Sequence, residues 1–171
     1  VDVNYLTLSG ELNDDDIYNI QNRLVSLLEI DMKGVKMEAL PASFFYQRHA
    51  LQNIVLPEVL KTIGSEAFYQ CYSLSGIALP ASLEAIEDGV FRNCTRLDTL
   101  FVPDGVTSVG TNAFYGCSNL WSVVLPPTLK TIEAFAFRNC TALSRLVLPD
   151  SLTSISSYAF GGDAKLSLIH I

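Results

Sequence analysis

The chain has 171 residues, 49% of them apolar, and a formal net charge of −7 at pH 7. This apolar fraction is ample for a core, which excludes an intrinsically disordered chain. Only 11 residues are Lys or Arg, and they are spread along the chain, so a nucleic-acid partner is not expected. No run of about 18 apolar residues could span a membrane. No basic segment precedes an apolar one, as it would in a signal peptide.

The first 50 residues are predicted to form an N-terminal cap. Residues 3–12 alternate between apolar and polar side chains, which predicts a strand. A helix over residues 14–29 comes next, because Asn13 can cap it and three aspartates fill the first turn, where the helix dipole favours negative charge. These aspartates lack the alternating oxygen ligands and the glycine of a calcium loop, so capping is the preferred interpretation.

The end of the cap, residues 35–50, is predicted to be a degenerate copy of the repeat found in the rest of the chain. Leu40 and Phe45 occupy the positions that Ile63 and Phe68 hold in the first full repeat. The terminal units of repeat proteins are usually atypical, because they must cover an otherwise exposed end of the stack.

Residues 51–171 repeat one phrase every 23 residues, as five full units and a truncated sixth. A fixed period of this length is the signature of a solenoid, in which each unit buries its apolar side against its neighbours. Five columns recur: the leucines Leu51, Leu74, Leu97, Leu120, Leu143 and Leu166; the prolines Pro57, Pro80, Pro103, Pro126 and Pro149; the phenylalanines Phe68, Phe91, Phe114, Phe137 and Phe160; the first aliphatic column Ile54, Ile77, Leu100, Val123, Leu146 and Ile169; and the second, Ile63, Ile86, Val109, Ile132 and Ile155.

Each unit is interpreted as a strand, a proline, a second short extended piece and one turn of helix. "LFVP" (100–103) alternates inward and outward side chains, and its proline ends the strand because it has no N–H to donate. "TNAFYGC" (111–117) has the spacing of a single helical or 3₁₀ turn. The predicted fold is an α/β solenoid: a right-handed superhelix of 23-residue repeats, with a parallel β-sheet, short helical turns and an N-terminal strand–helix cap.

A cysteine recurs in the first four full units, and it could indicate disulfides, a metal site or a nucleophile. Stacked in register, the four thiols would form a line, which neither converges on one metal ion nor turns the Cβ atoms toward each other. The two histidines, His49 and His170, lie outside the column, so no general base accompanies a thiol. We therefore expect the cysteines to be buried and structural; they are Cys71, Cys94, Cys117 and Cys140. No catalytic residue, metal or cofactor is expected.

The chain ends on "LSLIHI" (166–171), which reads as a strand without a polar closing element. An uncovered apolar edge invites aggregation. We therefore expect either that the natural protein continues beyond Ile171 or that another chain covers this edge, with continuation preferred.

The phrase L-x-x-I-x-L-P-x-x-L-x-x-I-x-x-x-A-F-x-x-C-x-x, as in Leu51–Ser73, resembles the BspA-like class of leucine-rich repeats, also called the Treponema pallidum type. The resemblance covers residues 51–171 closely and 35–50 loosely, while residues 1–34 resemble part of some Bacteroides-type surface proteins. It implies a leucine-rich-repeat-like fold, a location outside the cell or on a bacterial cell surface, and adhesion to host extracellular matrix or other cells. It carries no catalytic motif. The four unpaired cysteines alone would favour a reducing interior instead.

The outward positions of the long strands are the candidate binding site, because solenoids usually bind through a repeated outer face. The residues expected there are Phe101, Trp121, Val124 and Val147, which would form an apolar patch, with Asp98 and Arg145 beside it. Such patches tend to mark interaction sites. The alternative is that the β-branched residues are there only because they suit strands.

Three functions remain open at this stage. The preferred one is a non-catalytic binding or adhesion module that presents its β-face to a protein or glycan, as a monomer or with weak self-association. The second is a structural scaffold that self-associates through its apolar face or its open C-terminal edge. An enzyme is disfavoured, because no histidine, carboxylate pair and nucleophile meet in the repeat register.

Overall fold

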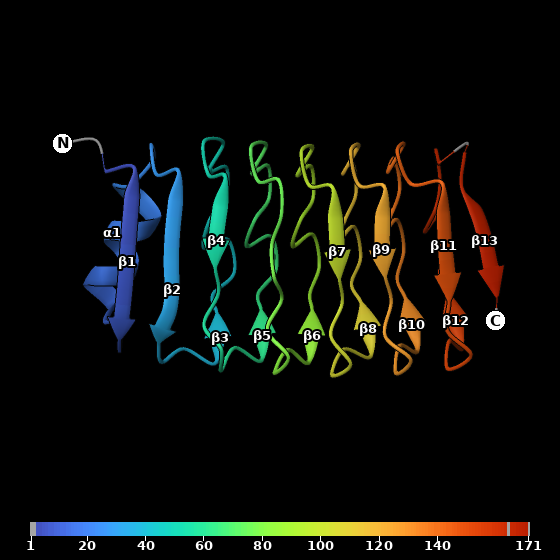
Figure 1. The fold of residues 1–171 in the computed structure, drawn as a ribbon, viewed down its shortest axis with the longest axis horizontal. Coiled ribbons are helices and arrows are strands. Elements are labelled where there is room, and N and C mark those ends of the chain that lie inside the picture. The colour runs from blue at the N-terminus through green and yellow to red at the C-terminus, as the bar shows by residue number, and fades with distance from the viewer. Residues whose placement is uncertain (1–2, 164, 171) are drawn as a thin grey trace.

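The computed structural model describes residues 3–163 and 165–170, and it is a solenoid of stacked parallel strands. Figure 1 shows the stack with its two termini at opposite ends. The long strands lie in one row and the short strands in another, and the helix lies beside the first strand. The prediction of a repeat solenoid is therefore confirmed.

Within the described residues, the long-strand row contains seven strands and the short-strand row contains six. The long strands are β1 (Tyr5–Gly10), β2 (Glu29–Val35), β4 (Asn53–Val55), β7 (Thr99–Phe101), β9 (Ser122–Val124), β11 (Arg145–Leu148) and β13 (Ser167–His170). The short strands are β3 (Ala39–Leu40), β5 (Thr62–Ile63), β6 (Ala85–Ile86), β8 (Ser108–Val109), β10 (Thr131–Ile132) and β12 (Ser154–Ile155).

The long strands pair in parallel, but the row is not continuous. It consists of the sheets β1–β2–β4, β7–β9 and β11–β13, and single bridges join Val55 to Ala78 and Gly76 to Thr99. The unit that holds Gly76 forms no regular long strand, since glycine has no side chain to pack and weakens a strand. At the last strand the 23-residue period fails, because Leu146 pairs with Leu168 and not with Ile169.

The short strands form one six-stranded parallel sheet that runs through the repeats. Its register joins Leu40 to Ile63, Ile63 to Ile86, and Ile132 to both Val109 and Ile155. The second aliphatic column and the predicted register of Leu40 are therefore confirmed.

The predicted helix over residues 14–29 is wrong at its C-terminal end. Helix α1 covers only Asp14–Asn22, although its N-terminus is as expected, with reciprocal hydrogen bonds between Asn13 and Asp16. The apolar pattern continues beyond residue 22, but Glu29 must begin β2, which pairs with β1. Pairing between strands therefore overrides the helical pattern. The division of the chain at residue 50 stays a prediction.

The segments expected to form a helical turn are instead runs of β-turns. In the third repeat, Ala113, Tyr115 and Cys117 donate backbone hydrogen bonds three residues back, while alternate residues donate to the next repeat, as Phe114 does to Ala136 O at 2.7 Å. This alternation requires a left-handed backbone at two positions in each repeat. In the third repeat these positions are Asn112 (φ 56°) and Gly116. The turns therefore form a third backbone ladder along the stack.

The core is a column of stacked rings enclosed by the two rows of strands and the turns. Successive phenylalanines lie parallel, with ring centroids 5.0–5.6 Å apart from Phe45 to Phe160. From Phe45 to Phe137 they are fully buried, and the cysteines and opening leucines lie beside them. One unit alone would expose these rings, so the period in the sequence and the stacking in space have the same cause.

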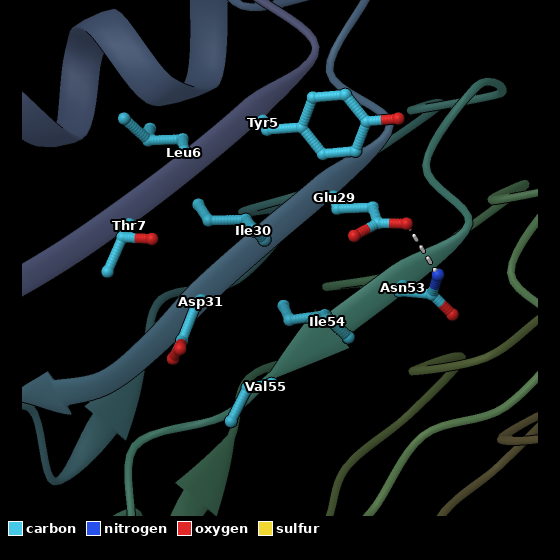
Figure 2. A pocket seen from close by; sticks show the side chains of 9 residues that line it. All are labelled: Tyr5, Leu6, Thr7, Glu29, Ile30, Asp31, Asn53, Ile54 and Val55. Carbon is cyan, nitrogen blue, oxygen red and sulfur yellow. Dashed lines mark hydrogen bonds between the residues drawn. The ribbon is translucent and has the colours of Figure 1, made fainter.

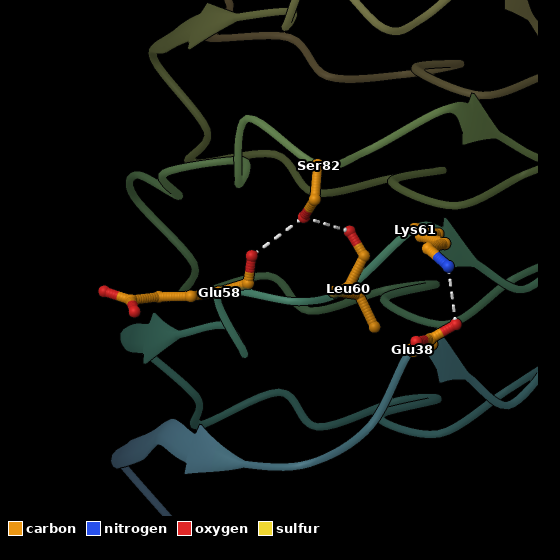
Figure 3. A network of polar contacts seen from close by, with 5 residues as sticks. All are labelled: Glu38, Glu58, Leu60, Lys61 and Ser82. Atoms are coloured by element: carbon orange, nitrogen blue, oxygen red, sulfur yellow. Dashed lines mark hydrogen bonds and ion pairs between the residues drawn. The ribbon is translucent and has the colours of Figure 1, made fainter.

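Polar side chains join neighbouring units along the rim of the stack, as Figure 3 shows. The Ser82 hydroxyl donates to the carbonyl oxygens of Glu58 and Leu60, at 2.8 and 2.7 Å, in the preceding unit. Lys61 pairs with Glu38 at 2.7 Å, and this hydrogen bond and charge raise the pKa of the lysine. The pair is solvent-exposed, so its contribution to stability is small.

Candidate binding surface

The β-face is defined here as the outward side chains of the long strands and of the residues that directly precede them. In β4, β7 and β9 the middle residue is buried, and the residues on either side of it point outward. Because the strands are parallel and in register, outward residues of successive units lie side by side, as Phe101 and Val124 do. The strand pattern therefore builds continuous outward columns.

An apolar patch occupies the C-terminal half of the β-face. Phe101 is 70% exposed, Trp121 58%, Val124 47% and Val147 38%. Val124 and Val147 line the same depression, of about 290 Å³, with Leu125. Its floor and sides are completed by Val123, Pro127 and Pro149. The structure therefore places Phe101, Val124 and Val147 side by side, and it leaves Trp121 exposed directly before β9.

The two charged residues predicted for the site lie at the beginning of their strands. The Asp98 carboxylate accepts a hydrogen bond from the Thr99 hydroxyl at 3.1 Å, and its backbone carbonyl accepts from the Trp121 N–H at 3.0 Å. Arg145 is exposed as the first residue of β11, and it forms no ion pair within the described part of the chain. Both can therefore reach a partner at the edge of the apolar patch.

The N-terminal half of the β-face carries more polar side chains. Figure 2 shows the side chains of Tyr5, Thr7, Glu29, Asp31 and Asn53 on β1, β2 and β4. Glu29 accepts a hydrogen bond from Asn53 at 3.0 Å, which joins two neighbouring strands. The β-face thus has more hydrogen-bonding side chains in its N-terminal half, where Val55 is the exposed valine of β4, and larger apolar side chains in its C-terminal half.

The four cysteines lie in the core. All are buried and free, and each thiol donates to the carbonyl oxygen of a phenylalanine in the preceding unit, as Cys117 does to Phe91 at 3.0 Å. Burial raises the pKa of Cys71 to about 12 and raises the pKa of Cys94 and Cys117 well above the ordinary value. The prediction that the cysteines of this column are buried and unpaired is therefore confirmed.

Sequence reasoning missed a second outward column, which lies on the turns. It contains Tyr46, Tyr69, Arg92, Tyr115 and Arg138, one per unit at the 23-residue period. The rings of Tyr46 and Tyr69 stack at 4.8 Å, and the Arg92 guanidinium lies 5.6 and 5.2 Å from the ring centroids of Tyr69 and Tyr115. The period itself was the available signal, but it is harder to see in a column that changes between tyrosine and arginine.

Known proteins support the fold and the family. The model for the BspA type leucine rich repeat region matches residues 38–167 in 6 copies. A leucine rich cell surface protein from Faecalibacterium prausnitzii has a similar crystal structure, with a TM-score of 0.83 and 26% identity over 99% of this chain and 48% of that one. The leucine-rich repeat protein of Treponema pallidum matches with a TM-score of 0.78 and 27% identity, over 93% of this chain and 78% of that one.

A leucine-rich repeat protein from Eubacterium ventriosum matches with a TM-score of 0.72 and 25% identity, over 94% of this chain and 43% of that one. This chain therefore spans about half the length of the F. prausnitzii protein. No curated protein sequence matches the chain. Within the described residues, no helix is both long and apolar enough to cross a membrane. The period, the stacked phenylalanines and the match over residues 38–167 lead to one conclusion: the chain belongs to the BspA-type leucine-rich repeat family.

Proposed function

We propose that the chain is a non-catalytic binding module that presents its β-face to a protein or glycan partner outside the bacterial cell. The observation that carries this proposal is the apolar patch: Phe101, Val124 and Val147 lie side by side, and Trp121 is exposed at the residue that precedes β9. Monomeric soluble proteins rarely expose contiguous apolar patches unless a partner covers them. Aromatic residues at such patches often supply most of the binding energy.

The chemistry of the patch favours a partner that inserts apolar side chains. The depression between Val124 and Val147 is lined by aliphatic side chains and prolines. A second depression, of about 320 Å³, lies beside Phe101 and is lined by Leu79, Ala81 and Pro103 with one carboxylate nearby. Sugar hydroxyls would find few hydrogen-bonding groups in either, so a protein segment is the better occupant.

The proposed location outside the cell is supported by the description of a similar structure. The F. prausnitzii relative is described as a cell surface protein. Adhesion to host extracellular matrix is the finer form of the proposal, and it depends on the same apolar patch.

Binding to immobilised extracellular-matrix proteins tests the proposal. The double variant Phe101→Ala, Trp121→Ala should lose at least about tenfold in affinity, because removal of an interface anchor typically costs more than 1 kcal/mol. Its melting temperature should stay close to that of the wild type, because both side chains are exposed. Tyr5→Ala is the matched control: Tyr5 is 67% exposed on the N-terminal half of the same face, and its loss should leave binding unchanged.

Two outcomes would contradict the proposal. Undiminished binding by the double variant would show that the patch is not the contact surface. Light scattering across a dilution series addresses the second candidate, the self-associating scaffold. If the wild type dimerises at low concentration and the double variant stays monomeric, the patch joins copies of this chain.

A further inference from the structure

The outward column on the turns forms a second surface, separate from the β-face. The turns also supply the buried phenylalanines and cysteines, so the core lies between the turns and the long strands. We use the name turn face for the outward column Tyr46, Tyr69, Arg92, Tyr115 and Arg138 together with the side chains beside it. A ligand on this surface would not contact the apolar patch.

The main-chain N–H groups of the turn-face column, and those of the residue that follows each of its members, are already paired with other backbone groups. Alternate N–H groups donate to the next unit, as Gln70 does to Arg92 O at 2.8 Å, and the intervening ones donate three residues back, as Tyr69 does to Glu66 O at 3.0 Å. A peptide that adds a strand needs unpaired main-chain groups. Recognition on this surface must therefore come from side chains.

Two guanidinium groups on the turn face lie against aromatic rings and, within the described residues, have no anionic partner. Arg92 lies between Tyr69 and Tyr115, and Arg138 lies 5.4 and 5.9 Å from the ring centroids of Phe135 and Tyr158. Within the described residues neither guanidinium forms a hydrogen bond or an ion pair, although the chain carries 18 acidic residues. Contact with the rings restricts each side chain, and a guanidinium group is a planar fork of donors that suits a carboxylate.

Neutral hydrogen-bonding groups lie in the column that follows the arginines and tyrosines. The Gln47 amide donates to Gln70 at 2.9 Å, and the Asn139 amide donates to the Tyr115 hydroxyl at 3.4 Å. Amides and phenol hydroxyls that both donate and accept match the hydroxyl groups of sugars. Glu66 lies in the neighbouring column, beside Tyr69, so an anion is favoured toward the C-terminal part of the turn face.

We propose that the turn face binds an acidic oligosaccharide, with Arg92 and Arg138 taking sugar carboxylates while tyrosine hydroxyls and amides take the ring hydroxyls. The two arginines are two units apart, which is about 10 Å at the usual strand spacing. A glycan with carboxylates repeated along its length can therefore engage both. The paired main-chain N–H groups and the neighbouring amides favour this ligand over an acidic peptide.

Calorimetric titration of the whole chain with oligogalacturonate of defined length tests the proposal. We expect binding that weakens with added salt and that disappears when the carboxyl groups of the same oligosaccharide are reduced to alcohols. Arg92→Gln and Arg138→Gln should each reduce the affinity about tenfold, as expected for loss of a charge-assisted hydrogen bond at an exposed site. Arg92→Lys keeps the charge but lacks the planar fork, so it should also bind more weakly.

Control variants separate this proposal from the function of the β-face. Arg145→Gln removes an exposed arginine from the β-face, and it should leave oligogalacturonate binding unchanged, as should the double variant at Phe101 and Trp121. Failure of wild-type binding to oligogalacturonate would overturn the proposal and leave the β-face test unaffected. Equal binding of an oligoglutamate peptide of matched charge would also overturn it, because the surface would then select charge and not sugar. Melting temperatures show whether each variant is folded.

Discussion

Phe101 and Phe114 belong to the same unit and have the same side chain, but they lie in two different regions of the molecule. Phe114 is fully buried between Phe91 and Phe137, at centroid distances of 5.4 and 5.0 Å, while Phe101 is 70% exposed on the β-face. Every full unit has phenylalanine at the position of Phe114, but only one unit has phenylalanine at the position of Phe101. In this chain, repetition of a residue accompanies packing and its variation accompanies exposure.

Substitution of the buried phenylalanine is the strongest test of this contrast between packed and exposed positions. Phe114→Ala should lower the free energy of unfolding by about 3–5 kcal/mol, because it removes a buried ring and leaves a cavity between two stacked rings. Urea unfolding monitored by circular dichroism measures the change. A loss below about 1 kcal/mol would contradict the view that the phenylalanine column holds the units together.

The repetition of cysteine in the interior stops at the C-terminal end of the column. Asp163 occupies the cysteine position in the fifth unit, where it is 8% exposed, and among the described residues neither carboxylate oxygen has a hydrogen-bond partner. Burial raises the pKa of this carboxyl to about 6. The folded state therefore holds a proton that the unfolded state releases near pH 4, and stability should fall as the pH rises from about 4 to 6.

Asp163→Cys should remove this pH dependence and complete the column. The new thiol could donate to the carbonyl oxygen of Phe137, as Cys140 does to that of Phe114 at 3.2 Å. We expect the variant to be more stable than the wild type by about 1–2 kcal/mol above pH 6, after allowance for solvent screening, with little difference near pH 4. Urea unfolding of both proteins at the two pH values measures this. An equal difference at both would show that the charge is not responsible.

The interior could be predicted from the sequence because close packing admits few residue types. The phenylalanine, cysteine and aliphatic columns are confirmed in register from Leu40 to Ile155. The end of helix α1 could not be predicted, because the apolar pattern continues into Leu24 and Leu27 and only the pairing of β2 with β1 ends the helix. At the last strand the period gave the wrong partner for Leu146.

The surface was only partly predictable for a different reason. Nothing in the packing dictates an outward residue, so its role must be inferred from its chemistry. Phe101 and Trp121 could be singled out because large apolar side chains are unusual on a surface, and they are indeed exposed. The turn-face column contains both tyrosine and arginine, so a pattern of repeated apolar residues does not include it. That these residues bind partners stays a prediction.

Substitution of a glycine on the β-face tests whether a variable, outward position can also add to stability. Gly76 interrupts the row of long strands, and a Cβ added there would meet no atom within 4 Å. Gly76→Thr, which matches Thr99 in the next unit, should raise the free energy of unfolding by about 0.5–1 kcal/mol, because it restricts the unfolded chain and supplies a strand-forming side chain. Thermal unfolding measures the gain, and a loss of stability would mean that the gap between β4 and β7 needs glycine.

The smallest expected effect belongs to the exposed phenylalanine. Phe101→Ala loses the side-chain pairing with Val124 across β7 and β9, which is worth well under about 1 kcal/mol on an exposed sheet face. Urea unfolding should therefore place it several times below Phe114→Ala, in the same unit and with the same atoms removed. If the two substitutions cost the same, the β-face would be part of the structural core, and its exposed aromatic residues would need no partner to explain them.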